Sequence, residues 1–238
     1  MHKAAVMHID VEFNFYLETG GKDPDKYSPT LRRYHKILWS KQLPNGVLLD
    51  LQDNKKNAYL YHSSDLGEFF LGSDSIVNSY KYHRSKQDII ANFKKEAEYL
   101  FGKASTIGAY IIFPNNKIED KPTINQERGI NKFIDDRFDL TLECIRLFYL
   151  NKPSPLYDTL IRYKKFFQLF GNFYGYIEFF LLDDILDKNK KIKFFTTFDG
   201  FKTAHNFKSE DDYLTYVKRA ANFVDARNRR IESYTAKI

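Results

Sequence analysis

The most distinctive hydrophobic pattern of the chain runs from Asp136 to Tyr149, where a narrow charged stripe crosses an otherwise apolar helical surface. With about 100° of rotation per residue in an α-helix, the charged positions fall within roughly 80° of one another. These positions are Asp136, Asp139, Glu143 and Arg146. Apolar side chains fill most of the remaining circumference, so only the stripe is expected to meet water or a ligand.

The same helical period continues through the C-terminal half of the chain. The helices predicted there cover 125–134, 136–150, 155–170, 174–186 and 211–233. A serine followed by a proline is typical of a helix start, and this pair occurs at Ser28 and at Ser154. One late strand is predicted over 193–198.

Shorter apolar segments make up the N-terminal half, separated by residues that favour turns. The predicted strands cover 8–17, 47–51, 58–62, 68–71 and 107–113, and the predicted helices cover 28–40 and 86–101. The polar stretch 115–123 is the candidate linker. We therefore predict an α+β fold, in which a small mixed β-sheet from the N-terminal half packs against a mainly helical C-terminal half.

Length and composition favour a single domain. A chain of 238 residues that is 43% hydrophobic can bury one large core. We expect an N-terminal α/β lobe over about 1–114 and a helical lobe over about 124–238. The 22 phenylalanines and 17 tyrosines recur at helical spacing, which favours core packing over an exposed stacking surface.

The charge, the single cysteine and the hydropathy restrict the setting of the protein. A net charge of +6 makes contact with polyanions plausible, but the basic residues are spread along the chain rather than clustered. Cys144 has no second cysteine with which to form an internal disulfide, which fits a reducing compartment. The sequence has no apparent signal peptide and no long uncharged apolar segment, so we expect a cytoplasmic protein that does not associate with membranes.

Several sequence strings resemble the pattern of an uncharacterised bacterial protein family, a domain of unknown function. The resemblance covers about residues 14 to 231, and it is most specific in the string DRFDLTLECIR. The other strings are DPDKYSPTLRRYHKILWSKQLPNG, GSDSI, IGAYIIFP, INQERG, SPL and ARNRRI. The resemblance implies a stand-alone bacterial protein. It carries no activity with it, so it assigns no catalytic residue.

The charged stripe is the first candidate site, and Arg128 precedes it in the sequence. Carboxylates on one helix face can act as acid and base, or can bind a divalent cation through oxygen ligands. An arginine beside them can neutralise a carboxylate or hold a phosphate. The structural alternative is an ordinary ion pair between Glu143 and Arg146, with Asp135 or Asp136 as a helix cap.

The segment that starts at Ser28 is the second candidate site. Its basic side chains and the only tryptophan lie at helical spacings of three and four, so several of them share a face. Such a face can hold phosphates and stack a base. The alternative is a surface helix anchored by its apolar residues. The candidate ligand-binding residues are Arg32, Arg33, His35, Lys36 and Trp39.

A small polar turn after a predicted strand is the third candidate, formed by Ser73, Asp74 and Ser75. Turns of this kind can offer backbone N–H groups to an anion, although most are simply turns. The turn lacks the lysine and glycine spacing of a P-loop. The motifs HExxH, CxxC, GxSxG and GxGxxG do not occur in the sequence, which removes the usual signals of zinc hydrolysis, dithiol chemistry, α/β-hydrolase acylation and dinucleotide binding.

Together these patterns favour a protein that binds a phosphate-bearing ligand, either a nucleotide or a nucleic acid, in a cleft between the lobes. In this hypothesis Arg32, Arg33 and Arg146 neutralise phosphate and Trp39 stacks on a base. The carboxylates would orient an arginine or a divalent cation, the one cofactor that the pattern could hold.

Two other classes of function stay open at this stage. The first is a hydrolase or transferase that acts on RNA or a nucleotide, with Glu143 or Asp136 as the base. The second is a protein-interaction module, in which the aromatic C-terminal helices present an exposed apolar patch. The sequence determines neither the reaction nor the oligomeric state.

Overall fold

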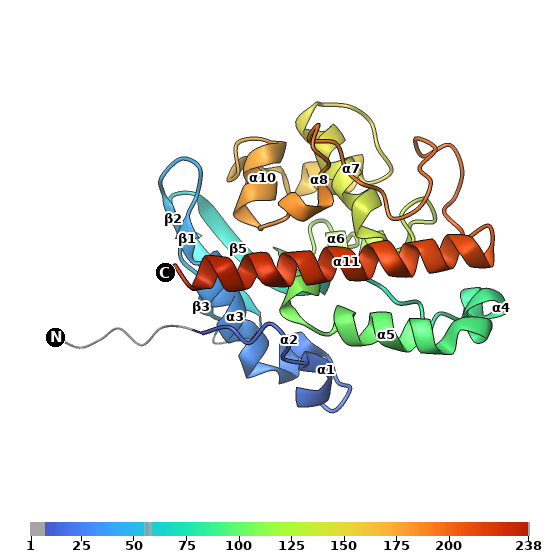
Figure 1. The fold of residues 1–238 in the computed structure, drawn as a ribbon. Coiled ribbons are helices and arrows are strands. Elements are labelled where there is room, and N and C mark those ends of the chain that lie inside the picture. Colours follow the sequence, from blue (N-terminus) through green and yellow to red (C-terminus); the bar gives the residue numbers. More distant parts are fainter. Residues whose placement is uncertain (1–7, 55, 57–58, 238) are drawn as a thin grey trace.

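Two small sheets lie in the N-terminal half of the chain, and helices make up the C-terminal half (Figure 1). The computed structural model describes residues 8–54, 56 and 59–237. Strands β1 (Lys41–Gln42) and β2 (Leu48–Leu49) form the first sheet. The second sheet has the order β3 (Gln52–Asp53), β4 (Leu60–Ser64), β5 (Gly67–Ser75), β6 (Tyr110–Pro114). The predicted α+β class is confirmed, and both sheets are antiparallel rather than mixed.

Eleven α-helices are found in the described residues, and most of them are short. The N-terminal ones are α1 (Phe15–Glu18), α2 (Pro24–Tyr27), α3 (Pro29–Trp39), α4 (Gln87–Ile90) and α5 (Lys94–Ala104). The later ones are α6 (Ile124–Ile130), α7 (Phe138–Tyr149), α8 (Tyr157–Arg162), α9 (Lys164–Gln168), α10 (Phe173–Phe179) and α11 (Glu210–Thr235). Single 3₁₀ turns cover Arg84–Lys86, Ala91–Phe93, Ile107–Ala109 and Asp183–Ile185.

The predicted start of α3 is confirmed in its atomic detail. The Ser28 side chain accepts a hydrogen bond from the backbone N–H of Leu31, and Pro29 occupies the first turn, where its missing N–H has no helical partner to lose. The same signal at Ser154 was misleading, because α8 begins at Tyr157 without a side-chain cap. The position of α2 just ahead of Ser28 brings the N-terminal segment over the end of β5.

Two predicted strands are wrong. Residues 8–17 contain a turn and α1, where Asn14 caps the helix by accepting from the N–H of Leu17. Residues 193–198 form an irregular segment, and beside them Leu186 and Ile192 make only an isolated bridge. Both segments are rich in aromatic residues, which suit strands by propensity but are held here by packing instead.

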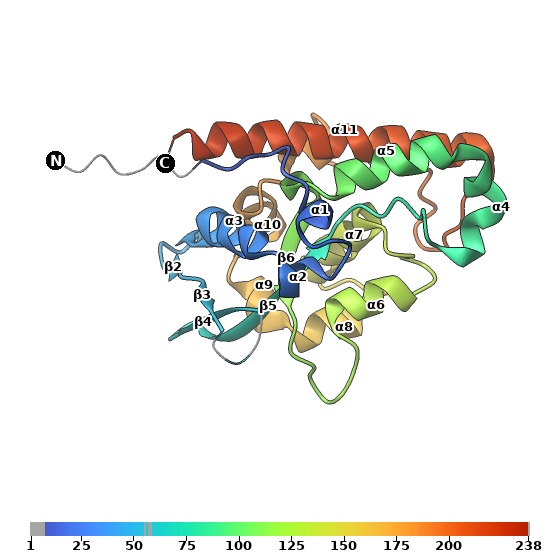
Figure 2. The same cartoon turned by 90° about the horizontal axis from the view of Figure 1, so that it is seen from below.

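Helix α11 spans the molecule and packs along α5 (Figure 2). Arg227 of α11 is fully buried, and its guanidinium donates to the carbonyls of Gly108, Tyr110 and Phe180 at 2.8–3.3 Å. This side chain joins β6 to the end of α10. The buried apolar side chains form one cluster that includes residues of both halves. Within the described part of the chain, no helix is long and apolar enough to cross a membrane.

Candidate functional site

The end of β5 meets α6 and the segment before α7 around the guanidinium of Arg128. This side chain is fully buried and forms an ion pair with Asp74. Its Nη2 lies 3.4 Å from Oδ1 of Asp136 and donates to the carbonyl oxygen of the same residue at 3.1 Å, while Nε donates to Oγ1 of Thr141 at 2.9 Å. The buried cation of Arg128 therefore connects the carboxylates of Asp74 and Asp136, which are far apart in the sequence.

Asp136 lies before helix α7 rather than on it. Asp135 and Asp136 both adopt left-handed backbone conformations, with φ of 48° and 60°, and the first residue of α7 is Phe138. The Asp136 carboxylate accepts a hydrogen bond from Nδ2 of Asn78 at 2.8 Å. Burial raises the pKa of this carboxyl, and the charge of Arg128 opposes that rise.

The remaining members of the predicted stripe have separate partners. Asp139 is fully buried, pairs with Arg137 through both oxygens and accepts the N–H of Phe195 at 2.8 Å. Glu143 and Arg146 form a bidentate ion pair with both distances at 2.7 Å. The prediction of one continuous charged face that includes Asp136 is therefore wrong, because the helix starts too late. The alternative of an i, i+3 ion pair is confirmed for Glu143 and Arg146.

A chain of hydrogen bonds leads from the core to the last residues of β5. The prediction of a polar turn at Ser73, Asp74 and Ser75 is wrong, because these residues belong to β5 and pair with β6. The indole Nε1 of Trp39 donates to Nδ1 of His35 at 3.0 Å, and Nε2 of His35 lies 2.6 Å from Oγ of Ser73. The backbone N–H of Ser73 then donates to both carboxylate oxygens of Asp25, at 2.8 and 2.9 Å. Burial lowers the pKa of His35 to about 3 and raises the pKa of Asp25 to about 7.

The second candidate site does not form an accessible face. Trp39 is fully buried and packs against Phe180, with 5.2 Å between ring centroids, so its ring cannot stack on an external base. Arg32 donates to the carbonyl of Asp25 at 2.6 Å, and Lys36 pairs with Asp53 at 2.6 Å. Arg33 is exposed over the ring of Tyr34. Of the five residues, His35 contacts the cluster at the end of β5 through Ser73, and Arg32 contacts it through the backbone of Asp25.

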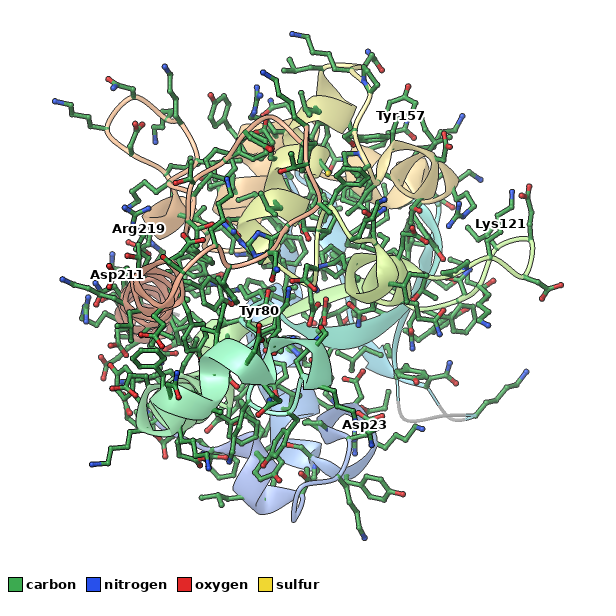
Figure 3. All side chains as sticks on the ribbon, turned by 90° about the vertical axis from the view of Figure 1, so that its right-hand side faces the viewer. Asp23, Tyr80, Lys121, Tyr157, Asp211 and Arg219 are labelled. Atoms are coloured by element: carbon green, nitrogen blue, oxygen red, sulfur yellow. The ribbon has the colours of Figure 1, made fainter. Side chains whose placement is uncertain are left out.

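A pocket of about 510 Å³ lies beside this cluster. Its lining includes Ser75, Asn78 and Asp136, which join it directly to the Arg128 network. Most of the lining comes from residues before 111, so the pocket belongs largely to the N-terminal half rather than to a cleft between two lobes. Figure 3 labels Asp23, which lines the pocket, and Tyr80, which lies in the sequence between the lining residues Ser79 and Lys81.

The pocket also carries basic and aromatic side chains. Lys22, Lys81 and His83 line it, and Lys81 forms an ion pair with Glu98. The rings of Tyr16 and Tyr82 each pack edge-on against Phe101, with centroid distances of 4.8 and 5.8 Å. Tyr82 is 67% exposed, so part of its ring surface is free to meet a ligand. Within the described residues, no group of three or more His, Cys, Asp or Glu side chains is arranged so that it could hold a metal ion.

Sequence patterns pointed separately to five residues that the structure brings together, namely Ser73, Asp74, Ser75, Arg128 and Asp136. The same patterns gave no signal for other residues of the site, because the partners of those residues are far away in the sequence. Asp25 reads as part of a turn, yet its carboxylate binds a backbone N–H that lies 48 residues later. The missed residues are Asp25, Asn78, Tyr16, Lys22, Lys81 and Tyr82.

The strings that carry the family resemblance supply most of this cluster. Each of five cluster residues lies within one of these strings, namely Asp25, Ser73, Asp74, Arg128 and Asp136.

In a comparison with protein families, residues 9–231 match the model described as "Family of unknown function (DUF6994)". The chain belongs to this family, as the resemblance predicted. No curated protein and no solved structure matches the chain.

Proposed function

We propose that this chain is a cytoplasmic bacterial protein that binds a nucleotide in the pocket beside the Arg128 cluster. The observation that supports the proposal is that one pocket gathers three basic side chains, exposed tyrosine surface and the Asp136–Asn78 pair. Its volume of about 510 Å³ lies within the range of about 300–1,000 Å³ that is usual for small-molecule sites.

Each part of the pocket matches one part of a nucleotide. Lys22, Lys81 and His83 provide N–H donors that can bind phosphate oxygens. A carboxylate such as that of Asp136 accepts hydrogen bonds from ribose hydroxyls, and an exposed tyrosine ring such as that of Tyr82 can stack on a base. Arg128 is too deeply buried to touch the ligand, so we assign it the role of holding Asp136 in place.

The proposal replaces the phosphate-binding residues that the sequence suggested. Arg32 and Arg146 are engaged with protein partners, and Arg33 lies on an exposed face of α3. We assign their function first to Lys22, which lines the pocket and forms no ion pair within the described residues, whereas Lys81 is shared with Glu98. The limited volume of the site, about 510 Å³, favours a mononucleotide over a nucleic acid, which needs an extended basic groove.

Thermal unfolding and calorimetry with a panel of nucleoside mono-, di- and triphosphates test the proposal, in the presence and absence of Mg²⁺. At least one nucleotide should raise Tm, and Lys22→Gln should weaken its binding about tenfold, equivalent to about 1.4 kcal/mol. Lys26→Gln is the matched control, because Lys26 is an exposed neighbour that does not line the pocket.

Equal effects of Lys22→Gln and Lys26→Gln would contradict this placement of the phosphates. Absence of binding by every nucleotide would overturn the proposal as a whole. A single-stranded RNA that binds while mononucleotides do not would favour the nucleic-acid alternative. Arg33→Gln provides a further comparison, because it lowers binding only if the exposed face of α3 is the true site.

An enzymatic function has one specific observation in its favour. Burial raises the pKa of Asp136, and this carboxyl lines the pocket, so it could serve as a base toward a bound nucleotide or RNA. Glu143, the other candidate, is held by Arg146 and is not among the described lining residues. Asp136→Asn should then abolish turnover, with a much smaller loss of nucleotide binding from the altered contact to ribose. Turnover that survives this substitution would exclude Asp136 as the base.

A further inference from the structure

A second cavity, of about 710 Å³, lies between α11 and the irregular segment 184–198. Its interior is apolar, with Ile185, Phe195 and Phe223 buried in the wall and Phe194 and Phe198 partly exposed. It shares no lining residue with the proposed nucleotide pocket, so its role is independent of that site.

The wall of this cavity is preformed. The N–H of Phe195 donates to Asp139 at 2.8 Å, and the N–H of Lys193 donates to the carbonyl of Ile185 at 2.8 Å. The rings of Phe194 and Phe198 stack with 4.2 Å between their centroids. These contacts fix both ends of the segment, so the cavity does not depend on a ligand to hold its shape.

Unpaired positive charge lies next to the apolar interior. The guanidinium of Arg219 donates one hydrogen bond, to the carbonyl of Phe194 at 2.9 Å, and within the described residues it has no carboxylate partner. Lys193 also lines the cavity without an ion pair in that part of the chain. Asp184, the acidic residue of the lining, is already bound by Arg230 at 2.7 and 3.0 Å. Arg219 and Lys193 therefore offer two cationic side chains to an anionic group at the edge of the cavity.

Arg219 marks the boundary between apolar and polar space. An adjoining cavity of about 340 Å³ shares Thr196, Phe198 and Arg219 with the first one, but much of its remaining lining is polar. Figure 3 shows Arg219 on α11, close to the orange chain that forms the opposite wall. A ligand whose anionic group reaches Arg219 can thus place an apolar tail among the phenylalanines.

We propose that this cavity binds an aliphatic carboxylic acid, with its chain between α11 and the phenylalanine-rich segment and its carboxylate at Arg219. The planar fork of arginine matches a carboxylate with two parallel hydrogen bonds. Burial of a flexible hydrocarbon chain in the apolar interior supplies the rest of the affinity, at roughly 25 cal/mol per Å² of apolar surface removed from water.

Isothermal titration of the full chain with sodium decanoate, kept below the concentration at which it forms micelles, tests the proposal. Saturable binding of one molecule per chain is expected, with hexanoate and decanol weaker because the first has a short tail and the second has no charge. Arg219→Gln should weaken decanoate binding about tenfold or more, which is the usual effect of losing a charge-assisted hydrogen bond. Lys218→Gln removes the same charge from the preceding residue of α11, which lies outside the cavity, and should leave binding unchanged.

Ala226→Phe provides a second test, because it fills the cavity from the α11 side without removing a charge. It should abolish decanoate binding and leave nucleotide binding unchanged. The proposal is overturned if decanoate does not bind, if Arg219→Gln and Lys218→Gln behave alike, or if decanol binds as tightly as decanoate.

Discussion

The indole Nε1 of Trp39 lies 3.0 Å from Nδ1 of His35, and this contact fixes the tautomer of the imidazole. An indole nitrogen can only donate, so Nδ1 must accept and the ring proton must reside on Nε2. That proton points to Oγ of Ser73, 2.6 Å away. His35 therefore cannot accept a proton from Ser73, and the pair does not form the nucleophile and base of a serine hydrolase.

The Trp39–His35 contact yields the first prediction. Trp39→Phe keeps an aromatic ring in the core but removes the donor, so Nδ1 of His35 is left buried without a partner. We expect the free energy of unfolding to fall by about 1–3 kcal/mol, as measured by urea denaturation. Nitrogen NMR of the imidazole should show the Nε2–H tautomer in the original protein and a changed signal in the variant. Tyr99→Phe, at an exposed ring, is the control and should change stability by less than about 0.5 kcal/mol.

Asp25 should give the protein a distinct pH dependence. Burial raises the pKa of its carboxyl from 3.8 to about 7, so between these values the folded state binds more protons than the unfolded state. The contribution of Asp25 to stability is therefore complete below pH 3.8 and is lost as the pH rises toward 7, with a slope of at most about 1.4 kcal/mol per pH unit.

Asp25→Asn should remove this component, so that the stability of the variant relative to the original protein increases between pH 4 and pH 7. Denaturation curves at a series of pH values measure it. His35 acts in the opposite sense, because its pKa is lowered to about 3 and its stabilising effect is lost as the pH falls below 6.5. A parallel shift of the two stability curves, with no change in slope, would contradict the assignment to Asp25.

Two arginine ion pairs of different burial should respond differently to substitution. Arg128→Met leaves Asp74 and Asp136 as partly buried carboxylates without their cation, and we expect a loss of about 3–5 kcal/mol. Arg146 is more exposed than Arg128, but Arg146→Met still leaves the buried carboxylate of Glu143 without its cation, so we expect a smaller loss of about 1–3 kcal/mol. Comparable losses in chemical denaturation would show that the Arg128 cluster does not have the stabilising role assigned to it.

Gly108 lies where α11 comes closest to the chain before β6. A Cβ at this position would lie 2.4 Å from Oδ1 of Asn228 and 2.8 Å from the carbonyl oxygen of Val224, distances that real Cβ atoms do not tolerate. Gly108→Ala should therefore lower Tm, because it must push α11 away. The matched change Gly102→Ala, in α5 with open space around it, should raise stability by about 0.5–1 kcal/mol. The two variants should thus shift a thermal unfolding curve in opposite directions.

Cys144 should react slowly with thiol reagents while the protein is folded. The side chain is fully buried, and burial raises the pKa of its thiol to about 12. A colorimetric disulfide reagent at pH 8 should therefore modify it only after addition of denaturant. Rapid labelling of the folded protein would show that the region around α7 opens readily, which the dense packing of that helix argues against.

Local patterns predicted the parts of the fold in which neighbouring residues act together. Ser28 and Pro29 determine where α3 begins. The helix predicted over 211–233 agrees with the bounds of α11 to within two residues at either end. The pattern at 136–150 predicted a helix correctly but not its start. Tyr80 donates to the carbonyl of Asp135 at 2.7 Å and, with Arg128, helps to hold the turn that delays the helix to Phe138.

The sequence by itself determined the α+β class, the main helices, the family and several of the polar residues that form the cluster. Only the tertiary structure decided which of these residues meet, because their contacts join positions dozens of residues apart and leave no local period. It also decided that Trp39 is buried and that Tyr82 is exposed. The free energy that separates the two rings comes from the side chains packed around each one, which the folded chain alone provides.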